Sequence, residues 1–125
     1  MKLRELQAMV NKSLATKAKV GGIAETTLRD QIYELMAQLP DDKVTTYGDL
    51  AAFAGHPYKA RRVGEIAHGG TTELPWHRLV NFKGGLAVGF PGGQDVQRQL
   101  LEQDGIICES GRVADFEERR WRPNL

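Results

Sequence analysis

The chain has 125 residues, of which 41% are hydrophobic, and its 17 basic and 16 acidic residues give a formal net charge of +1. This length fits one domain with a short extension and is enough to bury a hydrophobic core without covalent staples. The near balance of charge excludes a polycationic protein, although a local basic patch would still be enough to bind phosphates.

A single cysteine, Cys108, excludes an internal disulfide framework and a cysteine-cluster metal site. One lone thiol fits a reducing cytoplasm, which is where we expect the protein to act. No stretch approaches the roughly 20 apolar residues that cross a bilayer. We therefore expect no membrane partner, no metal and no other cofactor.

Residues 1–24 differ in charge from the rest of the chain. They hold one acid, Glu5, against five basic residues: Lys2, Arg4, Lys12, Lys17 and Lys19. This pattern favours a flexible basic extension ahead of a domain of residues 25–125. It leaves open a basic arm that contacts nucleic acid.

The first helix predicted in the domain follows Thr27 and ends at Pro40. Thr27, with Asp30 three residues later, resembles a capping box. One face of this helix carries the apolar residues Leu28, Ile32, Leu35, Met36 and Leu39.

Two short helices joined by a turn then predict a helix-turn-helix. The first begins near Thr46, and the second runs from about Pro57 to Ala67, after a turn at Gly55. The second helix would be the recognition helix, because its first half holds three cations and no acid: Lys59, Arg61 and Arg62. DNA binding and an ordinary solvated helix face explain these charges equally well.

Residues 74–81 predict an apolar, partly buried strand. The loop at residues 82–93 is rich in glycine but lacks the spacing of a phosphate-binding loop, so no nucleotide site is expected there.

The last third of the chain predicts a helix and a hairpin. The helix spans residues 94–105, with Val96, Leu100 and Leu101 as its apolar residues. The hairpin turns at residues 109–111 and is followed by a basic tail.

Four blocks in this order, "KVTTYGDLAAFAG", "PYKARRVG", "PWHRLVN" and "LLEQDG", resemble the DNA-binding domain of the alkylguanine-DNA alkyltransferases. The combination is more similar still to the alkyltransferase-like branch of that family. The resemblance implies a mainly α-helical fold with small β elements, in which a winged-helix-like helix-turn-helix domain enters the minor groove of DNA.

Trp76 marks the difference from the enzymes of this family. They carry Pro-Cys-His-Arg where this chain has Pro-Trp-His-Arg, and their thiolate takes the alkyl group from 6-O-alkylguanine. An indole offers a flat apolar face and one N–H donor, but no nucleophile at neutral pH. The resemblance therefore implies a non-enzymatic protein that binds the lesion in double-stranded DNA, flips the nucleotide and passes the damage to nucleotide excision repair proteins.

The resemblance also implies three groups of site residues. The lesion pocket is expected to include Tyr47, Trp76 and Val80. DNA contacts are expected from Tyr47, Lys59, Ala60, Arg61 and Arg62, with Arg61 entering the gap that the extruded base leaves. Supporting roles are expected for His77, Arg78, a buried Asn81 and Asp104, the last as the acidic partner of His77.

Some family members place an arginine in the pocket after the strand, whereas residues 82–90 of this chain hold Lys83 as their one cation. The preferred alkyl group therefore stays open. Two other functions also stay open: a helix-turn-helix transcriptional regulator that reads undamaged DNA, and an enzyme that uses Cys108 or a water activated by His77. For Cys108 the pattern favours a buried structural thiol. A monomer is expected, since no dimerisation helix stands out.

Overall fold

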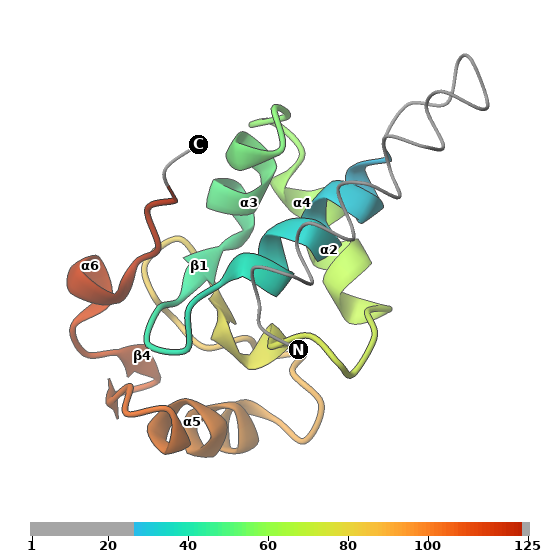
Figure 1. The fold of residues 1–125 in the computed structure, drawn as a ribbon. Coiled ribbons are helices and arrows are strands. Elements are labelled where there is room, and N and C mark those ends of the chain that lie inside the picture. Colours follow the sequence, from blue (N-terminus) through green and yellow to red (C-terminus); the bar gives the residue numbers. More distant parts are fainter. Residues whose placement is uncertain (1–26, 124–125) are drawn as a thin grey trace, which may run out of the picture.

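The computed structural model describes residues 27–123, so the expectations for residues 1–24 lie outside it. The fold is mainly helical with small β elements, as predicted (Figure 1). Each strand has two residues. Its elements in chain order are α2 (Leu28–Gln38), β1 (Thr45–Thr46), α3 (Tyr47–Phe53), α4 (Ala60–His68), the 3₁₀ turn η1 (Trp76–Arg78), β2 (Leu79–Val80), α5 (Gln94–Gln103), β3 (Cys108–Glu109), β4 (Arg112–Val113) and α6 (Phe116–Arg119).

The predicted first helix is confirmed as α2. Thr27 Oγ1 accepts a hydrogen bond of 3.1 Å from the backbone N–H of Asp30, which satisfies one of the free donors of the first turn. Ile32 and Met36 are completely buried and belong to the hydrophobic cluster that α2 forms with α3 and α4.

The helix-turn-helix is formed by α3 and α4. Thr46 Oγ1 caps α3 by accepting from the N–H of Asp49 at 3.0 Å. The prediction that the second helix starts at Pro57 is wrong by one turn. Residues 55–59 close a turn of their own, in which the Lys59 N–H donates to the His56 carbonyl at 2.9 Å, so α4 begins at Ala60.

The prediction of a strand over residues 74–81 is also largely wrong. After Pro75 the chain forms the η1 turn, in which the Arg78 N–H donates to the Pro75 carbonyl at 3.0 Å. Only Leu79 and Val80 are extended, and as β2 they pair in parallel with β1.

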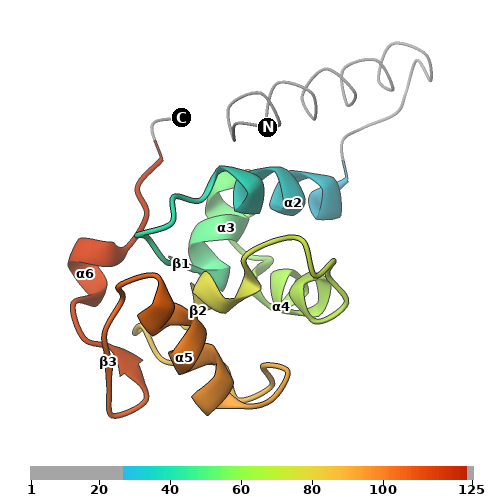
Figure 2. The same ribbon diagram turned by 60° about the horizontal axis from the view of Figure 1, so that its bottom comes forward.

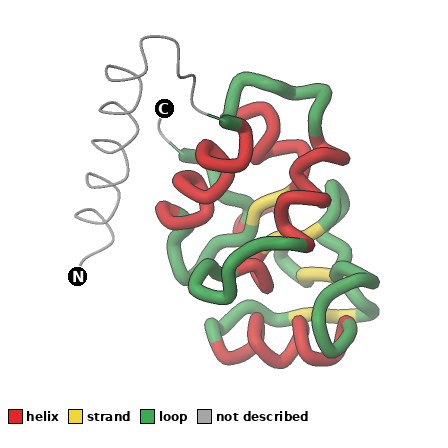
Figure 3. Tube along the Cα trace, turned by 90° about the vertical axis from the view of Figure 1, so that its right-hand side faces the viewer, coloured by secondary structure: helices red, strands yellow, loops and turns green. Residues whose placement is uncertain are grey.

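This strand pair separates two hydrophobic clusters, and Figure 2 shows β2 between α4 and α5. Successive side chains of a strand point to opposite faces. Leu79 accordingly packs with α2, α3 and α4, while Val80 packs with α5 and the hairpin. The turned view of Figure 3 likewise shows short strands between helical segments.

The apolar face predicted for α5 is wrong at one position. Val96 is exposed, whereas the neighbouring Gln97 is completely buried. The Gln97 amide donates to the carbonyls of His77 and Leu79, both at 3.1 Å, and its oxygen accepts from the Ala87 N–H at 2.7 Å. A polar side chain with these partners is stable in a core, although a hydrophobic pattern does not reveal it.

The hairpin at residues 109–111 is confirmed by the antiparallel pairing of β3 and β4. The expected basic tail after it is folded instead. The Trp121 ring lies edge-on to the Phe53 ring of α3, with centroids 5.9 Å apart. The Arg120 guanidinium binds both carboxylate oxygens of Asp49 at 2.7 Å, which ties the end of the chain to the helix-turn-helix.

Candidate nucleic-acid interface

Lys59 and Arg61 differ from every other lysine and arginine among residues 27–123. Their side chains make no hydrogen bond, ion pair or ring contact within this part of the chain, whereas each of the other ten has at least one such contact. Arg62, the third predicted cation, pairs with Glu65 at 2.9 Å. The start of the recognition helix therefore presents two cations whose charge is available to a partner.

A shallow groove runs beside these two cations. It is lined by Leu28, Tyr58, Lys59, Arg61, Arg62 and Glu65. Tyr58 is 98% exposed, the largest exposed fraction among the large hydrophobic side chains that the structure describes. A bare aromatic ring beside cations can contact sugars and bases while the cations bind phosphates. Ala60, also predicted to contact DNA, is the first residue of α4 and lies between Lys59 and Arg61.

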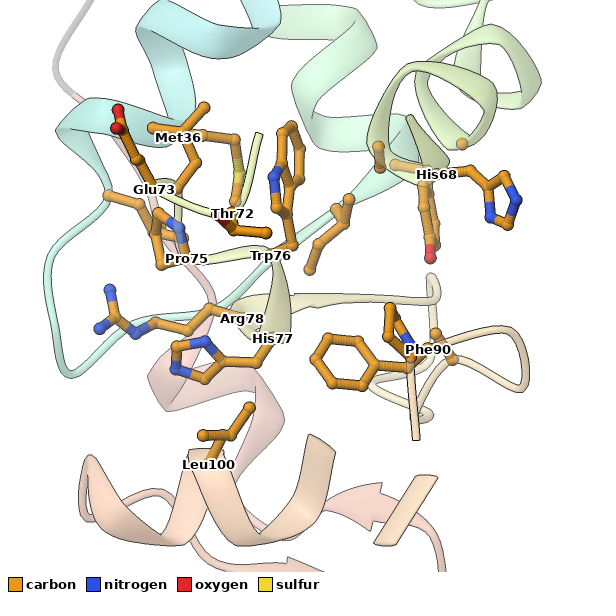
Figure 4. A pocket seen from close by; sticks show the side chains of 18 of the residues that line it. Met36, His68, Thr72, Glu73, Pro75, Trp76, His77, Arg78, Phe90 and Leu100 are labelled. Atoms are coloured by element: carbon orange, nitrogen blue, oxygen red, sulfur yellow. The ribbon is translucent and has the colours of Figure 1, made fainter. Parts of the chain in front are cut away.

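A pocket of about 910 Å³ opens next to α4. Its walls come from α2, the helix-turn-helix, the segment of residues 72–79 and the loop of residues 87–91. Figure 4 shows the Trp76 indole in the middle of this pocket, with Met36 on one side and Phe90 and His68 on the other. This volume is sufficient for a nucleobase with a substituent.

Trp76 is held in place by three contacts with the protein. Its Nε1–H donates to the Thr71 carbonyl at 2.6 Å, and its ring lies edge-on to Tyr33 with centroids 5.8 Å apart. Gly70 passes so close that a Cβ there would lie 2.5 Å from the indole ring. Because the N–H is already bonded, the indole offers a ligand only its carbon faces.

Tyr47, the first residue of α3, also lines the pocket. A Cβ on Gly64 of α4 would lie 3.8 Å from its ring, so the two helices approach closely at this point. Burial raises the pKa of the Tyr47 hydroxyl, which therefore stays protonated and able to donate a hydrogen bond at neutral pH.

His77, Arg78 and Asp104 form a network beneath Trp76. Asp104 Oδ2 lies 2.6 Å from His77 Nε2 and accepts from Arg78 Nε at 3.0 Å. Burial opposes ionisation of Asp104, but hydrogen bonds from His77 and Arg78, together with their charge, outweigh it and lower the pKa of this carboxyl. The contact expected between His77 and Asp104 is present, and the buried Arg78 is bound within the protein.

Two of the predicted site residues lie elsewhere. Val80 is not in the lesion pocket, because its position in β2 turns it into the opposite hydrophobic cluster. Asn81 is exposed rather than buried. Its Oδ1 nevertheless accepts from the N–H groups of Lys83 and Gly85, at 2.9 and 2.7 Å, and so shapes the turn after β2.

Phe90 is a pocket residue that the sequence analysis missed. Its ring enters the same pocket as Trp76 from the glycine-rich loop (Figure 4). The loop returns to α5 through Gly92 and Gly93, whose positive φ angles of 87° and 91° favour glycine. An aromatic residue shortly before such a pair of glycines was the available signal, because a loop of this kind can hold a ring over a cavity.

Cys108 lies on β3 and does not line the pocket. Burial, followed by the negative charge of Glu102, raises the pKa of its thiol. At neutral pH it is therefore a poor nucleophile. Within residues 27–123, no group of three or more His, Cys, Asp or Glu residues could hold a metal ion, and no helix has the length and apolar character needed to cross a membrane.

Known proteins resemble this chain in sequence. The chain is 37% identical over 101 residues to a DNA base-flipping protein of Escherichia coli, covering 78% of this chain and 76% of that protein. It is 39% identical over 99 residues to a DNA base-flipping protein of Vibrio parahaemolyticus, covering 74% of this chain and 94% of that protein.

Solved structures share the fold. An alkyltransferase-like protein of Schizosaccharomyces pombe, crystallised with damaged DNA containing O6-carboxymethylguanine, matches with a TM-score of 0.69 and 29% identity, over 77% of this chain and 95% of that one. A Mycobacterium tuberculosis alkyltransferase in complex with DNA matches with a TM-score of 0.59 and 27% identity, over 66% of this chain and 51% of that one. The family model of the DNA-binding domain of 6-O-methylguanine DNA methyltransferase matches residues 27–106, and the chain belongs to this family.

Proposed function

We propose that this protein recognises 6-O-alkylguanine in duplex DNA, turns the damaged nucleotide out of the helix into the Trp76 pocket and leaves its alkyl group in place. One observation carries the proposal. A hydrogen-bonded indole stands in the pocket at the position where the enzymes of the family carry their cysteine, beside the start of a recognition helix where the side chains of Lys59 and Arg61 have no partner within residues 27–123. The relatives named DNA base-flipping proteins, and the alkyltransferase-like protein bound to damaged DNA, support it.

The absence of alkyl transfer follows from the chemistry of the pocket. Transfer requires a nucleophile that attacks the alkyl carbon while the guanine leaves. The indole nitrogen of Trp76 holds its proton in a bond to the Thr71 carbonyl, and Cys108 lies outside the pocket as a protonated thiol. His77 forms its hydrogen bond with Asp104 and follows Trp76 in the chain. We therefore assign it a structural role, in which it supports Trp76.

Nucleotide flipping suits the placement of Arg61. Extruding a base costs a few kcal/mol, and least where pairing is already weakened by damage. The planar guanidinium of Arg61 has no partner in the described chain, so it can enter the gap, stack between the neighbouring bases and donate to the orphaned partner base. Entry from the minor groove suits a damage sensor, since that groove carries little sequence information.

The lesion is recognised through apolar contact. Trp76, Phe90 and Met36 present carbon surfaces to the pocket. A 6-O-alkyl group packs on these surfaces, whereas unmodified guanine would bring its polar edge there without a partner.

Equilibrium binding to two duplexes that differ by one 6-O-methylguanine tests the proposal. The salt concentration is fixed, because phosphate contacts make affinity salt-dependent. Protein and DNA masses are measured on the same samples. We expect tighter binding to the lesion with both masses unchanged. Equal binding would favour a regulator of undamaged DNA, and an alkylated protein or a dealkylated base would reveal an enzyme.

A protein that binds damaged DNA without repairing it must mark the damage for other repair proteins. We propose that the bound DNA is passed to nucleotide excision repair in the cytoplasm and that the protein works as a monomer. A strain without this protein should then be sensitive to alkylating agents only while excision repair is intact. If the two defects simply add, the transfer to excision repair is wrong.

A further inference from the structure

The charged side chains around the Trp76 pocket are unevenly distributed. Among the described residues that line the pocket, Arg78 is the single lysine or arginine, whereas Asp41 and Glu73 are carboxylates. The substituent of a flipped lesion lies at Trp76, because the enzymes of the family carry at this position the cysteine that takes the alkyl group. The charges around Trp76 therefore determine which end groups a 6-O-substituent can carry.

The positive charge of Arg78 is already paired within the protein. Its Nε donates to Asp104 Oδ2 at 3.0 Å, and its Nη2 lies 3.5 Å from Asp41 Oδ1. The side chain is buried, so an anionic substituent could bind it only by displacing one of these carboxylates. Displacing one partner of a buried charge pair is costly, because the other charge is left without compensation.

The remaining ionisable side chains of the pocket add no fixed positive charge. His77 lies 2.6 Å from Asp104, on the same carboxylate oxygen that Arg78 binds. Glu73 and His68 are both exposed and lie on opposite sides of the indole (Figure 4). The negative charge of Glu73 repels a carboxylate that enters the pocket.

The uncharged surface of the pocket also gives a carboxylate no advantage. The hydroxyls of Tyr47 and Thr72 can donate to an ether, hydroxyl or amide oxygen as well as to a carboxylate. Trp76, Met36 and Phe90 present carbon surfaces. A charged group that exchanges water for such surfaces loses far more free energy than a neutral group of the same size.

We propose that the pocket selects uncharged 6-O-substituents and disfavours substituents that end in a carboxylate. This proposal rests on the proposed binding of 6-O-alkylguanine and adds the chemical class of the substituent to it. Alkyl, hydroxyalkyl and carbamoylmethyl groups belong to the accepted class, and a carboxymethyl group does not.

The test compares duplexes that carry 6-O-carbamoylmethylguanine or 6-O-carboxymethylguanine at the same position. The amide and the carboxylate have nearly the same size and shape, so the two lesions differ chiefly in charge. Kd is measured at fixed salt and at about pH 8, where histidine side chains add little positive charge. The proteins are the unchanged chain, Phe90→Arg, which brings a cation to the pocket, and Phe90→Leu, which removes the same ring without adding charge.

The unchanged protein should bind the amide lesion about tenfold more tightly than the carboxylate lesion. In Phe90→Arg the guanidinium pairs with the carboxylate, so the ratio of the two Kd values should fall close to one, whereas in Phe90→Leu it should stay at about ten. Each ratio compares two lesions on one protein, so a general loss of affinity in a variant does not alter it.

Equal Kd values for the two lesions in the unchanged protein would overturn the proposal. The same ratio in the two variants would also overturn it, since the preference would then not depend on the charge of the pocket. Equal binding of 6-O-methylguanine and guanine duplexes by the unchanged protein is a separate result, which would contradict the proposed function instead.

Discussion

The recognition element and the C-terminal segment are both basic, but their charged side chains behave in opposite ways. At the start of α4, Lys59 and Arg61 have no partner in the described chain, and the Tyr58 ring beside them is bare. In the C-terminal segment, Arg112, Arg119, Arg120 and Arg122 all bind acceptors of the protein. A count of basic residues therefore does not locate the interface, whereas the lack of intramolecular partners does.

The C-terminal segment has a structural role. Arg120 holds Asp49 in the first turn of α3, and Trp121 supports the far end of the same helix through Phe53. The segment thus fixes the helix that positions Tyr47 and the recognition turn. Changes at Lys59 or Arg61 should weaken DNA binding and leave folding intact, whereas changes in the C-terminal segment should first lower the stability of the fold.

The largest expected effect is on lesion binding by Arg61→Ala. Without the group that fills the gap, binding to the 6-O-methylguanine duplex should weaken by about 2–3 kcal/mol, or roughly 30- to 150-fold in Kd. Thermal unfolding should be unchanged, because the Arg61 side chain has no hydrogen bond or ion pair within residues 27–123. Arg62→Ala is the matched control, and its effect should be at most about fivefold. Equal effects at the two positions would contradict the assignment of Arg61.

The converse effect is expected for Arg120→Ala. This change breaks two hydrogen bonds to a partly buried carboxylate and should lower the free energy of unfolding by about 2 kcal/mol, measured by urea denaturation. Arg122→Ala breaks only an exposed pair, so a change below about 0.5 kcal/mol is expected. If the folded Arg120→Ala protein lost its lesion preference without losing stability, the division of roles would be wrong.

A smaller effect should come from the length of the alkyl group. Each methylene that the pocket buries contributes about 0.8 kcal/mol, so affinity should rise from 6-O-methyl- to 6-O-ethyl- and 6-O-propylguanine until the pocket is full. Competition binding with one duplex series measures this. Flat or falling affinity from the smallest group upward would show that the carbon surfaces of Trp76 and Phe90 do not touch the lesion.

The smallest effect concerns acid stability. Because the folded state lowers the pKa of Asp104, its contribution is complete above the ordinary value of 3.8 and is lost as the pH falls through the lowered pKa. The unchanged protein should lose more stability below pH 3.8 than Asp104→Asn does. Parallel pH profiles of the two proteins in urea denaturation would show that ionised Asp104 does not stabilise the fold.

Local signals in the sequence were sufficient for part of the fold. The caps at Thr27 and Thr46 need only a hydroxyl and a donor three residues later, so a short stretch of sequence reveals them. The η1 turn was not predicted because the apolar residues on either side of it, Leu74 and Leu79–Val80, resemble a strand, while the hydrogen bond from the Arg78 N–H to the Pro75 carbonyl is invisible in the sequence.

Local sequence signals likewise revealed only part of the site. The framework around Trp76 could be expected from the Pro-Trp-His-Arg motif, but the side to which each residue turns depends on tertiary pairing. Val80 was assigned to the pocket although its register with Thr46 turns it away. Phe90 and Gln97 were missed because their partners come from distant segments.

Tryptophan fluorescence shows whether a damaged base enters the pocket at Trp76. The chain has two tryptophans, so a Trp121→Phe variant leaves Trp76 as the reporter. Titration with the 6-O-methylguanine duplex should quench this emission to saturation over the concentrations at which binding occurs, because the base stacks on the indole. The undamaged duplex should quench it little. Unchanged emission while the lesion duplex is fully bound would mean that the damaged base does not reach Trp76.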